Sequence, residues 1–340
     1  MSIEKPSKQV IERAAEILRA GGLVAFPTET VYGLGANALD AEAVAKIFAA
    51  KRRPADNPLI LHVSSISECE KYAELTPAAE VLMQQFWPGP LTIVLYSYEL
   101  VPLIARANLD TVALRAPVDP VARELIRVCG FPIAAPSANR SGRPSPTTAE
   151  AVCEDFCEPG NMLDLIIDGG PTAIGLESTV VDATGDRVAI LRPGGVTREM
   201  LAHYVDLIVD EAETAAYRSP GNRHRHYAPR IPLFLRDREE KGDAVFERVR
   251  GIRWCYMGMS EPPAGIDPPA EAILFDSLAA YAGNLFATMR RLETSGAELI
   301  VAELPVDGGL GAALRNRLRK AAGGERFTES DQGGARCTTS

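Results

Sequence analysis

The sequence predicts an α/β protein, with a twisted, mixed β-sheet covered by helices and a second, smaller α/β unit after it. Apolar runs of strand length recur along the chain, between segments whose apolar residues have helical spacing. Several of these runs follow one another without a helix between them, which favours a mixed sheet over a doubly wound parallel one. The 340 residues are enough for two domains of ordinary size.

The first part of the chain holds most of the expected elements. Apolar residues at helical spacing predict helices at 6–20, 41–51, 77–86 and 121–128. Apolar runs predict strands at 23–26, 59–63, 91–96, 111–117, 132–139, 165–170, 178–183 and 187–194. We expect this first domain, residues 1–210, to end near Asp210.

The remainder is expected to form a linker, a second domain and a tail. Residues 211–230 lack apolar periodicity, contain two prolines, and carry several arginines and two histidines, so we expect a linker. In the second domain, 231–325, strands are expected at 231–235, 252–257, 271–276 and 298–303, and helices at 277–295 and 310–322. Residues 326–340 are polar and glycine-containing, and we expect a flexible tail.

Composition narrows the class of protein. The net charge is −9, and residues 1–210 hold 18 Lys and Arg against 27 Asp and Glu, which argues against a nucleic-acid-wrapping protein. Six cysteines without a CxxC pair and only four histidines indicate neither a disulfide scaffold nor a zinc site. The sequence has no apolar run of about 20 residues and no signal-peptide pattern, so we expect a cytoplasmic protein without membrane contact.

Two loops carry groups suited to binding a small ligand. PTETVYGLG at 27–35 follows a strand and offers hydroxyls, a carboxylate and two glycines; its structural alternative is a turn around the glycine pair. KRRPADNP at 51–58 begins with three consecutive cations at a helix end, where they could simply complement the helix dipole. In an extended segment, however, alternation would let Lys51 and Arg53 face one polyanion while Arg52 faces water.

Three more segments carry polar side chains next to an apolar strand. The segment 134–145 brings Ser137 and Asn139 to a strand exit, although such residues also serve as local caps. The segments 175–180 and 191–195 contain Ser178 and Arg192, and a single arginine would be equally suited to a surface position. The common motifs GxxxxGK[ST], GxGxxG, GxSxG and HExxH are all missing, so any nucleotide site belongs to none of the commonest patterns.

Seven motifs, in this order, resemble the threonylcarbamoyl-AMP synthase family in its long form, called Sua5. They are PTETVYGLG, KRRPADNPLILHV, LRAP, PSANRSGRPSPT, GLESTVVD, LRPGG and SPGNRHRHYAP. The resemblance runs from about residue 8 to residue 325. It implies a YrdC-type catalytic domain with helices around a cationic cavity, a linker or lid at 211–230, and a Rossmann-like Sua5 C-terminal domain.

The resemblance implies a reaction in which L-threonine, bicarbonate or CO2, and ATP give threonylcarbamoyl-adenylate and pyrophosphate. Mg2+ would accompany ATP. A downstream threonylcarbamoyl transferase complex of the TsaD/Kae1 type would pass the group to adenosine 37 of tRNAs that read ANN codons, so contact with tRNA would be at most weak or indirect.

The resemblance also implies which side chains bind each substrate, with Lys51 and Arg53 as the catalytic residues that stabilise phosphate charge. Expected ATP contacts are Lys51, Arg53, Asn57, Thr111, Ala135, Ser137, Asn139, Ser145, Arg192 and Tyr227. Expected threonine contacts are Thr30, His62, Arg115 and Ser178, and no protein side chain is expected to hold a metal. In the linker, Arg223, Arg225, His226 and Tyr227 would form a lid; the alternative is an exposed basic tether.

Two other functions remain open at this point. The same domain type presents a basic cavity that would suit double-stranded RNA or tRNA, although the acidic balance of residues 1–210 argues against RNA binding as the primary role. A carbamoyltransferase on the same domain would consume carbamoyl phosphate, but such relatives normally carry additional catalytic modules that this sequence lacks.

Overall fold

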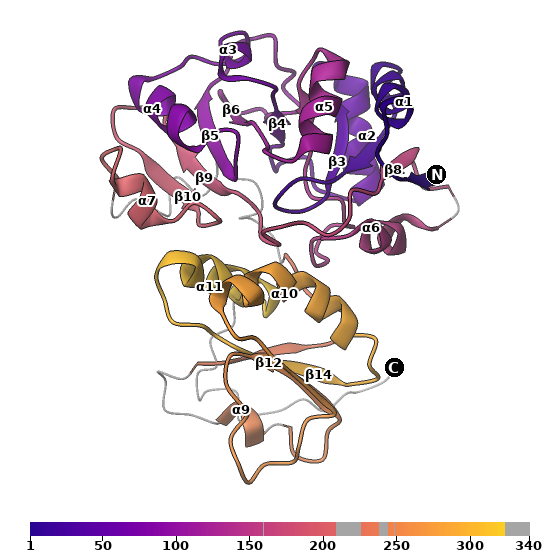
Figure 1. Ribbon diagram of the computed structural model, residues 1–340, viewed down its shortest axis with the longest axis vertical. Coiled ribbons are helices and arrows are strands. Elements are labelled where there is room, and N and C mark those ends of the chain that lie inside the picture. Colours follow the sequence, from indigo (N-terminus) through magenta and orange to yellow (C-terminus); the bar gives the residue numbers. More distant parts are fainter. Residues whose placement is uncertain (159, 209–225, 238–243, 248, 324–340) are drawn as a thin grey trace, which may run out of the picture.

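The protein folds around two β-sheets. Its structure is a computed structural model that describes residues 1–158, 160–208, 226–237, 244–247 and 249–323. Within these residues, one sheet has ten strands and the other has four. The two sheets and their helices form two units stacked along the long axis (Figure 1). The mixed α/β fold with a second, smaller unit is therefore confirmed.

The large sheet combines parallel and antiparallel neighbours in the order β1-β8-β2-β3-β7-β4-β6-β5-β9-β10. Its strands are β1 (Ser2–Glu4), β2 (Val24–Phe26), β3 (Gly33–Asn37), β4 (Ile60–His62), β5 (Leu91–Tyr96), β6 (Thr111–Arg115), β7 (Ile133–Ala134), β8 (Leu165–Ile167), β9 (Thr179–Asp182) and β10 (Ala189–Arg192). The pair β4–β6 is parallel, whereas β7 is antiparallel to β4. Strands distant in sequence thus become neighbours.

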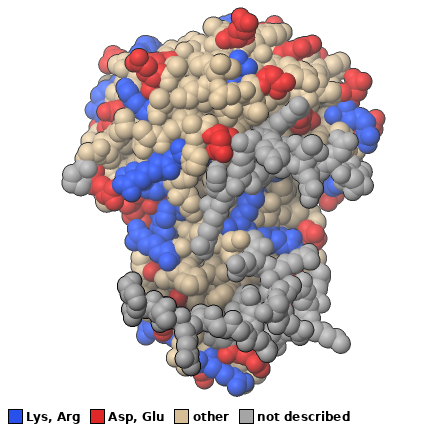
Figure 2. Space-filling model, turned by 180° about the vertical axis from the view of Figure 1, so that it is seen from behind, with Lys and Arg blue, Asp and Glu red and all other residues tan. Residues whose placement is uncertain are grey.

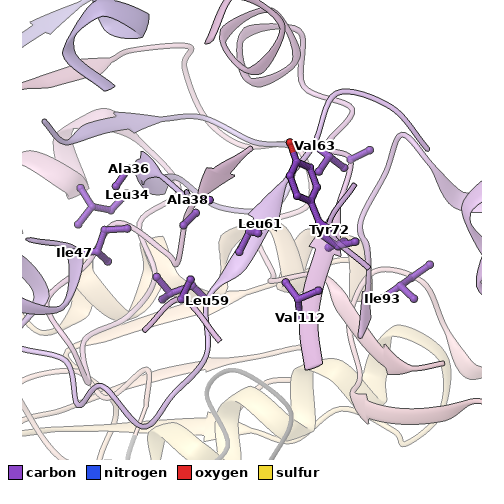
Figure 3. Close-up of a cluster of buried hydrophobic side chains, with 14 of the residues drawn as sticks. Leu34, Ala36, Ala38, Ile47, Leu59, Leu61, Val63, Tyr72, Ile93 and Val112 are labelled. Carbon is purple, nitrogen blue, oxygen red and sulfur yellow. The ribbon is translucent and has the colours of Figure 1, made fainter. Parts of the chain in front are cut away.

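Helices cover both faces of this sheet. They are α1 (Lys8–Arg19), α2 (Ala41–Lys51), α3 (Ile66–Cys69), α4 (Pro77–Phe86), α5 (Pro120–Cys129), α6 (Ala149–Phe156) and α7 (Arg198–Ala202). One apolar cluster joins α1 and α5 to the sheet. A larger cluster joins the strands to α2, α4 and α6, and Figure 3 shows part of it, with Ile47 of α2 beside Leu34 and Ala36 of β3. Burial of these apolar side chains stabilises the unit.

Strand β3 corrects the expectation of a turn around Gly33 and Gly35. The segment lies between β2 and β7 and is antiparallel to both. A Cβ atom at Gly35 would lie 2.8 Å from Ile133 Cγ2 and 2.8 Å from a ring carbon of Phe26. Glycine is needed here because neighbouring side chains approach the strand closely, and the same glycines made the sequence resemble a turn.

The second unit is a four-stranded parallel sheet in the order β11-β14-β12-β13. Its elements are β11 (Leu233–Arg236), α9 (Ala244–Glu247), β12 (Trp254–Gly258), β13 (Glu271–Leu274), α10 (Leu278–Leu292), β14 (Leu299–Glu303) and α11 (Gly309–Ala321). Helices α10 and α11 lie on the face of the sheet that is turned toward the first unit (Figure 1). Among the described helices, none is long and apolar enough to cross a bilayer.

Apolar side chains and ion pairs join the two units. Val31 and Leu176 of the first unit share a buried cluster with Tyr281 and Phe286 of the second. The expected linker 211–230 falls largely outside the described residues, as does the expected tail 326–340. The division at 1–210 and 231–325 stays a prediction.

Candidate functional site

A cavity opens beside the large sheet. Its walls come from seven separate stretches of chain: Thr28, Thr30, Val31, Gly33, Arg53, Pro58, Leu59, Ile60, His62, Arg115, Ala135, Pro136, Ser137, Glu177, Ser178, Arg192, His226 and Tyr227. Three arginines face one glutamate in this lining, so the cavity suits an anion. Figure 2 shows Lys and Arg gathered at the waist between the two units.

Strand ends place two of the expected threonine contacts side by side. His62 ends β4 and Arg115 ends β6, and the two residues are register partners on these parallel strands. Burial, reinforced by the nearby charge of Arg115, lowers the pKa of His62 to about 3. His62 is therefore neutral at pH 7, and its Nδ1 has no hydrogen-bond partner among the described residues.

Arg115 is held by a network that includes an acidic residue of the 27–35 loop. Its guanidinium donates to Glu29 Oε1 at 2.6 Å, to Thr30 Oγ1 at 3.0 Å and to the main-chain oxygen of Gly89 at 3.3 Å. A guanidinium has five N–H groups, so within the described part of the chain two remain for a ligand. The network fixes the orientation of Arg115 before any ligand binds.

Ser178 and Arg192 form one wall of the cavity. Arg192 Nη2 donates to the main-chain oxygen of Ser178 at 2.9 Å and to Ser178 Oγ at 3.2 Å. Ser178 Oγ also lies 2.8 Å from Thr92 Oγ1. Both residues are almost fully buried, so their hydrogen bonds are strengthened by the low local dielectric.

Arg53 points its guanidinium into the cavity lining from the loop after α2. Its Nη2 donates to the main-chain oxygens of Asn57 and Pro58, each at 3.2 Å. Its Nε has no partner among the described residues. Burial lowers the pKa of Arg53 to about 10, so the side chain stays positively charged at pH 7.

Lys51 lies behind the cavity wall and is absent from the lining. Its buried Nζ donates to the main-chain oxygens of Ser137 and Asn139. Burial holds the pKa of Lys51 well below its usual range. The extended geometry expected for 51–53 is wrong, because Lys51 ends α2 and Arg52 takes the left-handed conformation that terminates helices (φ 52°).

Four other expected ATP contacts also lie outside the lining. Asn139 fixes its loop: its Nδ2 donates to main-chain oxygens at 140 and 143, and its Oδ1 accepts from Ser137 Oγ at 2.6 Å. Ser145 Oγ donates to Glu177. Asn57 is buried in the loop that Arg53 contacts, and Thr111 begins the strand that Arg115 ends.

His226 and Tyr227 are the described part of the expected lid, and both line the cavity. Burial, together with the charge of Arg53, lowers the pKa of His226 to about 3. Tyr227 packs on Phe286 with ring centroids 5.3 Å apart and has a φ of 66°, which is a strained conformation for an aromatic residue. Arg223 and Arg225 lie outside the described residues.

Four charged side chains in or near the cavity were not assigned to the site from the sequence. Glu29 and Glu177 stand in the quoted motifs, whereas Arg317 comes from α11 of the second unit and donates to Glu177 Oε2 at 2.8 Å. Lys320 follows on the same helix, and burial lowers its pKa to about 7, with Arg317 and Arg192 adding to the effect. The sequence feature that could have identified Arg317 is its position beside Leu314 and Leu318, which places a charged residue on the apolar face of a helix.

The described residues contain no group of three or more His, Cys, Asp or Glu side chains placed to hold a metal ion. Among the residues that the structure describes, Glu177 is the single acidic one in the cavity lining. It is already bound by Ser145 and Arg317. A cation that enters this cavity with a polyanionic substrate would therefore be held mainly by that substrate.

Two family models together match most of the chain. The model described as "Telomere recombination", of the Sua5, YciO and YrdC proteins, matches residues 16–194. The model described as "Threonylcarbamoyl-AMP synthase, C-terminal domain" matches residues 196–323. The first match covers the ten-stranded sheet apart from β1, and the second covers the four-stranded unit.

Similar proteins match more than nine-tenths of this chain. Threonylcarbamoyl-AMP synthase of Pyrococcus abyssi is 43% identical over 333 residues, covering 94% of this chain and 96% of the relative. That of Bacillus subtilis is 43% identical over 326 residues, covering 92% and 93%. A crystal structure of P. abyssi Sua5 complexed with L-threonine has a TM-score of 0.82 at 43% identity, covering 94% and 96%. The chain therefore belongs to the threonylcarbamoyl-AMP synthase family of enzymes, in its long Sua5 form.

Proposed function

We propose that the cavity binds MgATP, L-threonine and bicarbonate or CO2, and joins them into threonylcarbamoyl-AMP with release of pyrophosphate. The cationic lining is the observation that carries this proposal, because three arginines from separate strands and loops converge on one hollow. The P. abyssi Sua5 structure, which contains L-threonine, supports the amino-acid part of the proposal.

The threonine end of the cavity would be formed by Thr30, His62, Arg115 and Ser178. The two remaining N–H groups of Arg115 suit a carboxylate, which a guanidinium binds with two parallel hydrogen bonds. His62, neutral at pH 7, offers a polar nitrogen without charge. Buried groups that pair with the threonine hydroxyl would be left unsatisfied by valine, so valine is rejected more strongly than serine.

The phosphate end would be formed by Arg53 and Arg192, with Ser137 as a polar contact. Threonine's ammonium loses a proton, the resulting amine adds to CO2, and a second proton leaves the nitrogen for solvent, which gives a carbamate. A carbamate oxygen then bonds to the α-phosphorus of ATP, the bond from that phosphorus to the β-phosphate oxygen breaks, and pyrophosphate leaves with its Mg2+. Fixed positive charge beside the phosphates stabilises the transition state without reorganisation.

Lys51 would act through the loop it holds. Its ammonium is already bound to the carbonyls of Ser137 and Asn139, and Ser137 lines the cavity. We infer that Lys51 positions Ser137 for the nucleotide. A direct contact between Lys51 and phosphate would require these hydrogen bonds to open, so the two roles predict different effects on stability.

The product is a reactive mixed anhydride, so a downstream enzyme must consume it. We propose a threonylcarbamoyl transferase of the TsaD/Kae1 type, acting on adenosine 37 of tRNAs that read ANN codons, with contact between this chain and tRNA at most weak or indirect. A cytoplasmic location is proposed as well. The five cysteines in the described residues are all free, as is usual in cytoplasmic proteins.

Purified protein, MgATP, radiolabelled bicarbonate and L-threonine would test the proposal. We expect pyrophosphate release that depends on threonine, with label recovered in an adenylate, and much less release with valine. Arg53→Ala serves as the matched inactive control. Consumption of carbamoyl phosphate without threonine, or retention of RNA without turnover, would contradict the proposal and favour a carbamoyltransferase or an RNA-binding module.

A further inference from the structure

Arg317 reaches from the second unit to the wall of the cavity. Its side chain is fully buried, and its Nε donates to Glu177 Oε2 at 2.8 Å. Its two terminal nitrogens donate to main-chain oxygens, one to Pro193 at 2.7 Å and the other to Glu177 at 3.3 Å. One side chain therefore joins the segments before β9 and after β10.

These two segments carry the wall that Ser178 and Arg192 form. Ser178 adjoins Glu177, and Arg192 adjoins Pro193, so Arg317 bonds directly beside both wall residues. The two segments are also tightly packed, because a Cβ atom at Gly194 would lie 2.3 Å from the main-chain nitrogen of Thr179. A small displacement of either segment must therefore move the other.

Glu177 completes the connection between the units. Its Oε1 accepts from Ser145 Oγ, so its two carboxylate oxygens are held by different units. Burial raises the pKa of Glu177, but the charges of Arg317 and Arg192 outweigh this effect and hold it below its usual value. Removing Arg317 would leave a buried carboxylate with one charged neighbour fewer, which is strongly unfavourable.

We propose that Arg317 is a positioning residue of the active site, through which the second unit fixes the Ser178 and Arg192 wall. The second unit is then a working part of the catalytic cavity. Arginine suits this task because its planar guanidinium bonds in several fixed directions at once, whereas the lysine ammonium is a single compact charge. Only the kinetic part of the test below rests on the proposed function.

The test compares Arg317→Gln with Arg315→Gln, which removes a nearly buried arginine from the same helix. Arg315 bonds to Pro305 and Asp237 within the second unit, away from the cavity. We expect Arg317→Gln to lower kcat/KM about 10- to 100-fold, as misplaced catalytic groups do. Arg315→Gln should keep its activity per folded molecule within about twofold, and Arg317→Lys should recover part of the lost activity.

Hydrogen exchange gives a readout that is independent of activity. The amides of Thr179 and Val196 are hydrogen-bonded, to Pro90 O and Thr179 Oγ1 respectively, each at 3.0 Å. We expect faster exchange at these amides in folded Arg317→Gln and no change there in Arg315→Gln. Equal exchange in both variants, or equal kcat/KM, would overturn the proposal. An inactive wild-type protein would instead contradict the proposed function.

Discussion

Two buried polar regions of this molecule use their hydrogen-bonding groups in opposite ways. At the carboxyl end of the parallel sheet, Glu303 Oε2 accepts hydrogen bonds from Tyr256 Oη and from the main-chain N–H groups of Met259 and Ser260, each at 2.9 Å. In the cavity beside the mixed sheet, polar atoms lack partners among the described residues: Arg53 Nε, His62 Nδ1 and His226 Nε2.

The difference shows where a ligand belongs. The carboxyl end of a parallel sheet is the usual place for one, yet here its polar groups satisfy each other. Four other buried atoms also lack partners among the described residues, but none of them lines the cavity: Thr172 Oγ1, Trp254 Nε1, Arg290 Nε and Arg315 Nε. Leaving several buried polar atoms unpaired around one hollow is costly for folding, so the cavity is better explained by binding than by stability.

The largest effect should come from the cavity, through Arg53→Ala. Because Arg53 supplies positive charge to the cavity lining, we expect a loss of kcat/KM that corresponds to about 2 to 4 kcal/mol of transition-state stabilisation. The melting temperature should change by less than about 2 °C. Steady-state pyrophosphate release and calorimetry check both values, and Arg52→Gln, at an exposed position, is the control.

Lys51→Ala sharpens this prediction. Its loss leaves the buried carbonyls of Ser137 and Asn139 without their donor, so we expect a drop in melting temperature as well as in activity. A variant that loses activity while its melting temperature stays unchanged would favour direct contact between Lys51 and phosphate over the positioning role.

A second effect should appear in the parallel sheet, as a loss of stability alone. Glu303→Ala leaves two partly buried main-chain N–H groups and the buried hydroxyl of Tyr256 without this acceptor, which we expect to cost about 2 to 4 kcal/mol of unfolding free energy. The melting temperature should fall by roughly 5–10 °C. Glu261→Ala, at an exposed position, is the matched control. A large loss of kcat/KM per folded molecule would contradict the conclusion that this region serves stability and the cavity serves binding.

The smallest expected effect is on the pH dependence of folding stability. The pKa of His62 and of His226 is about 3 in the folded protein, against an ordinary value of 6.5. The unfolded chain therefore binds more protons between these values, and stability falls as the pH is lowered from 6.5 toward 3. Thermal unfolding should show a shallower acid dependence for His226→Gln than for the wild type, with His203→Gln as the control. An equal slope would show that the imidazole of His226 is exposed to water.

Local patterns in the sequence were sufficient to predict most elements. The expected helix 41–51 matches α2, because Asp40 caps its start and apolar spacing persists to its end. The strand expected at 132–139 was too long: β7 is Ile133–Ala134, one further bridge joins Ser137 to Gly33, and the polar residues there belong to the cavity loop. Strand β3 was missed, because its glycines are required by tertiary packing and have no local signature.

The candidate site was predictable only in part, for a similar reason. Motif order identified Arg53, His62, Arg115, Ser178 and Arg192, and the structure brings all five into one lining. The direction of Lys51 depended on the left-handed conformation of Arg52, which nothing in the local sequence required. The role of Arg317 depended on how two distant units pack, which spacing along one helix cannot reveal.

The packing at Gly175 adds a mechanical consequence. A Cβ atom there would lie 2.5 Å from the main-chain oxygen of Gly283 in α10, so the two backbones touch without side chains between them. We therefore expect residues 175–178 to move together with α10 of the second unit, because a displacement of one backbone would bring it into contact with the other.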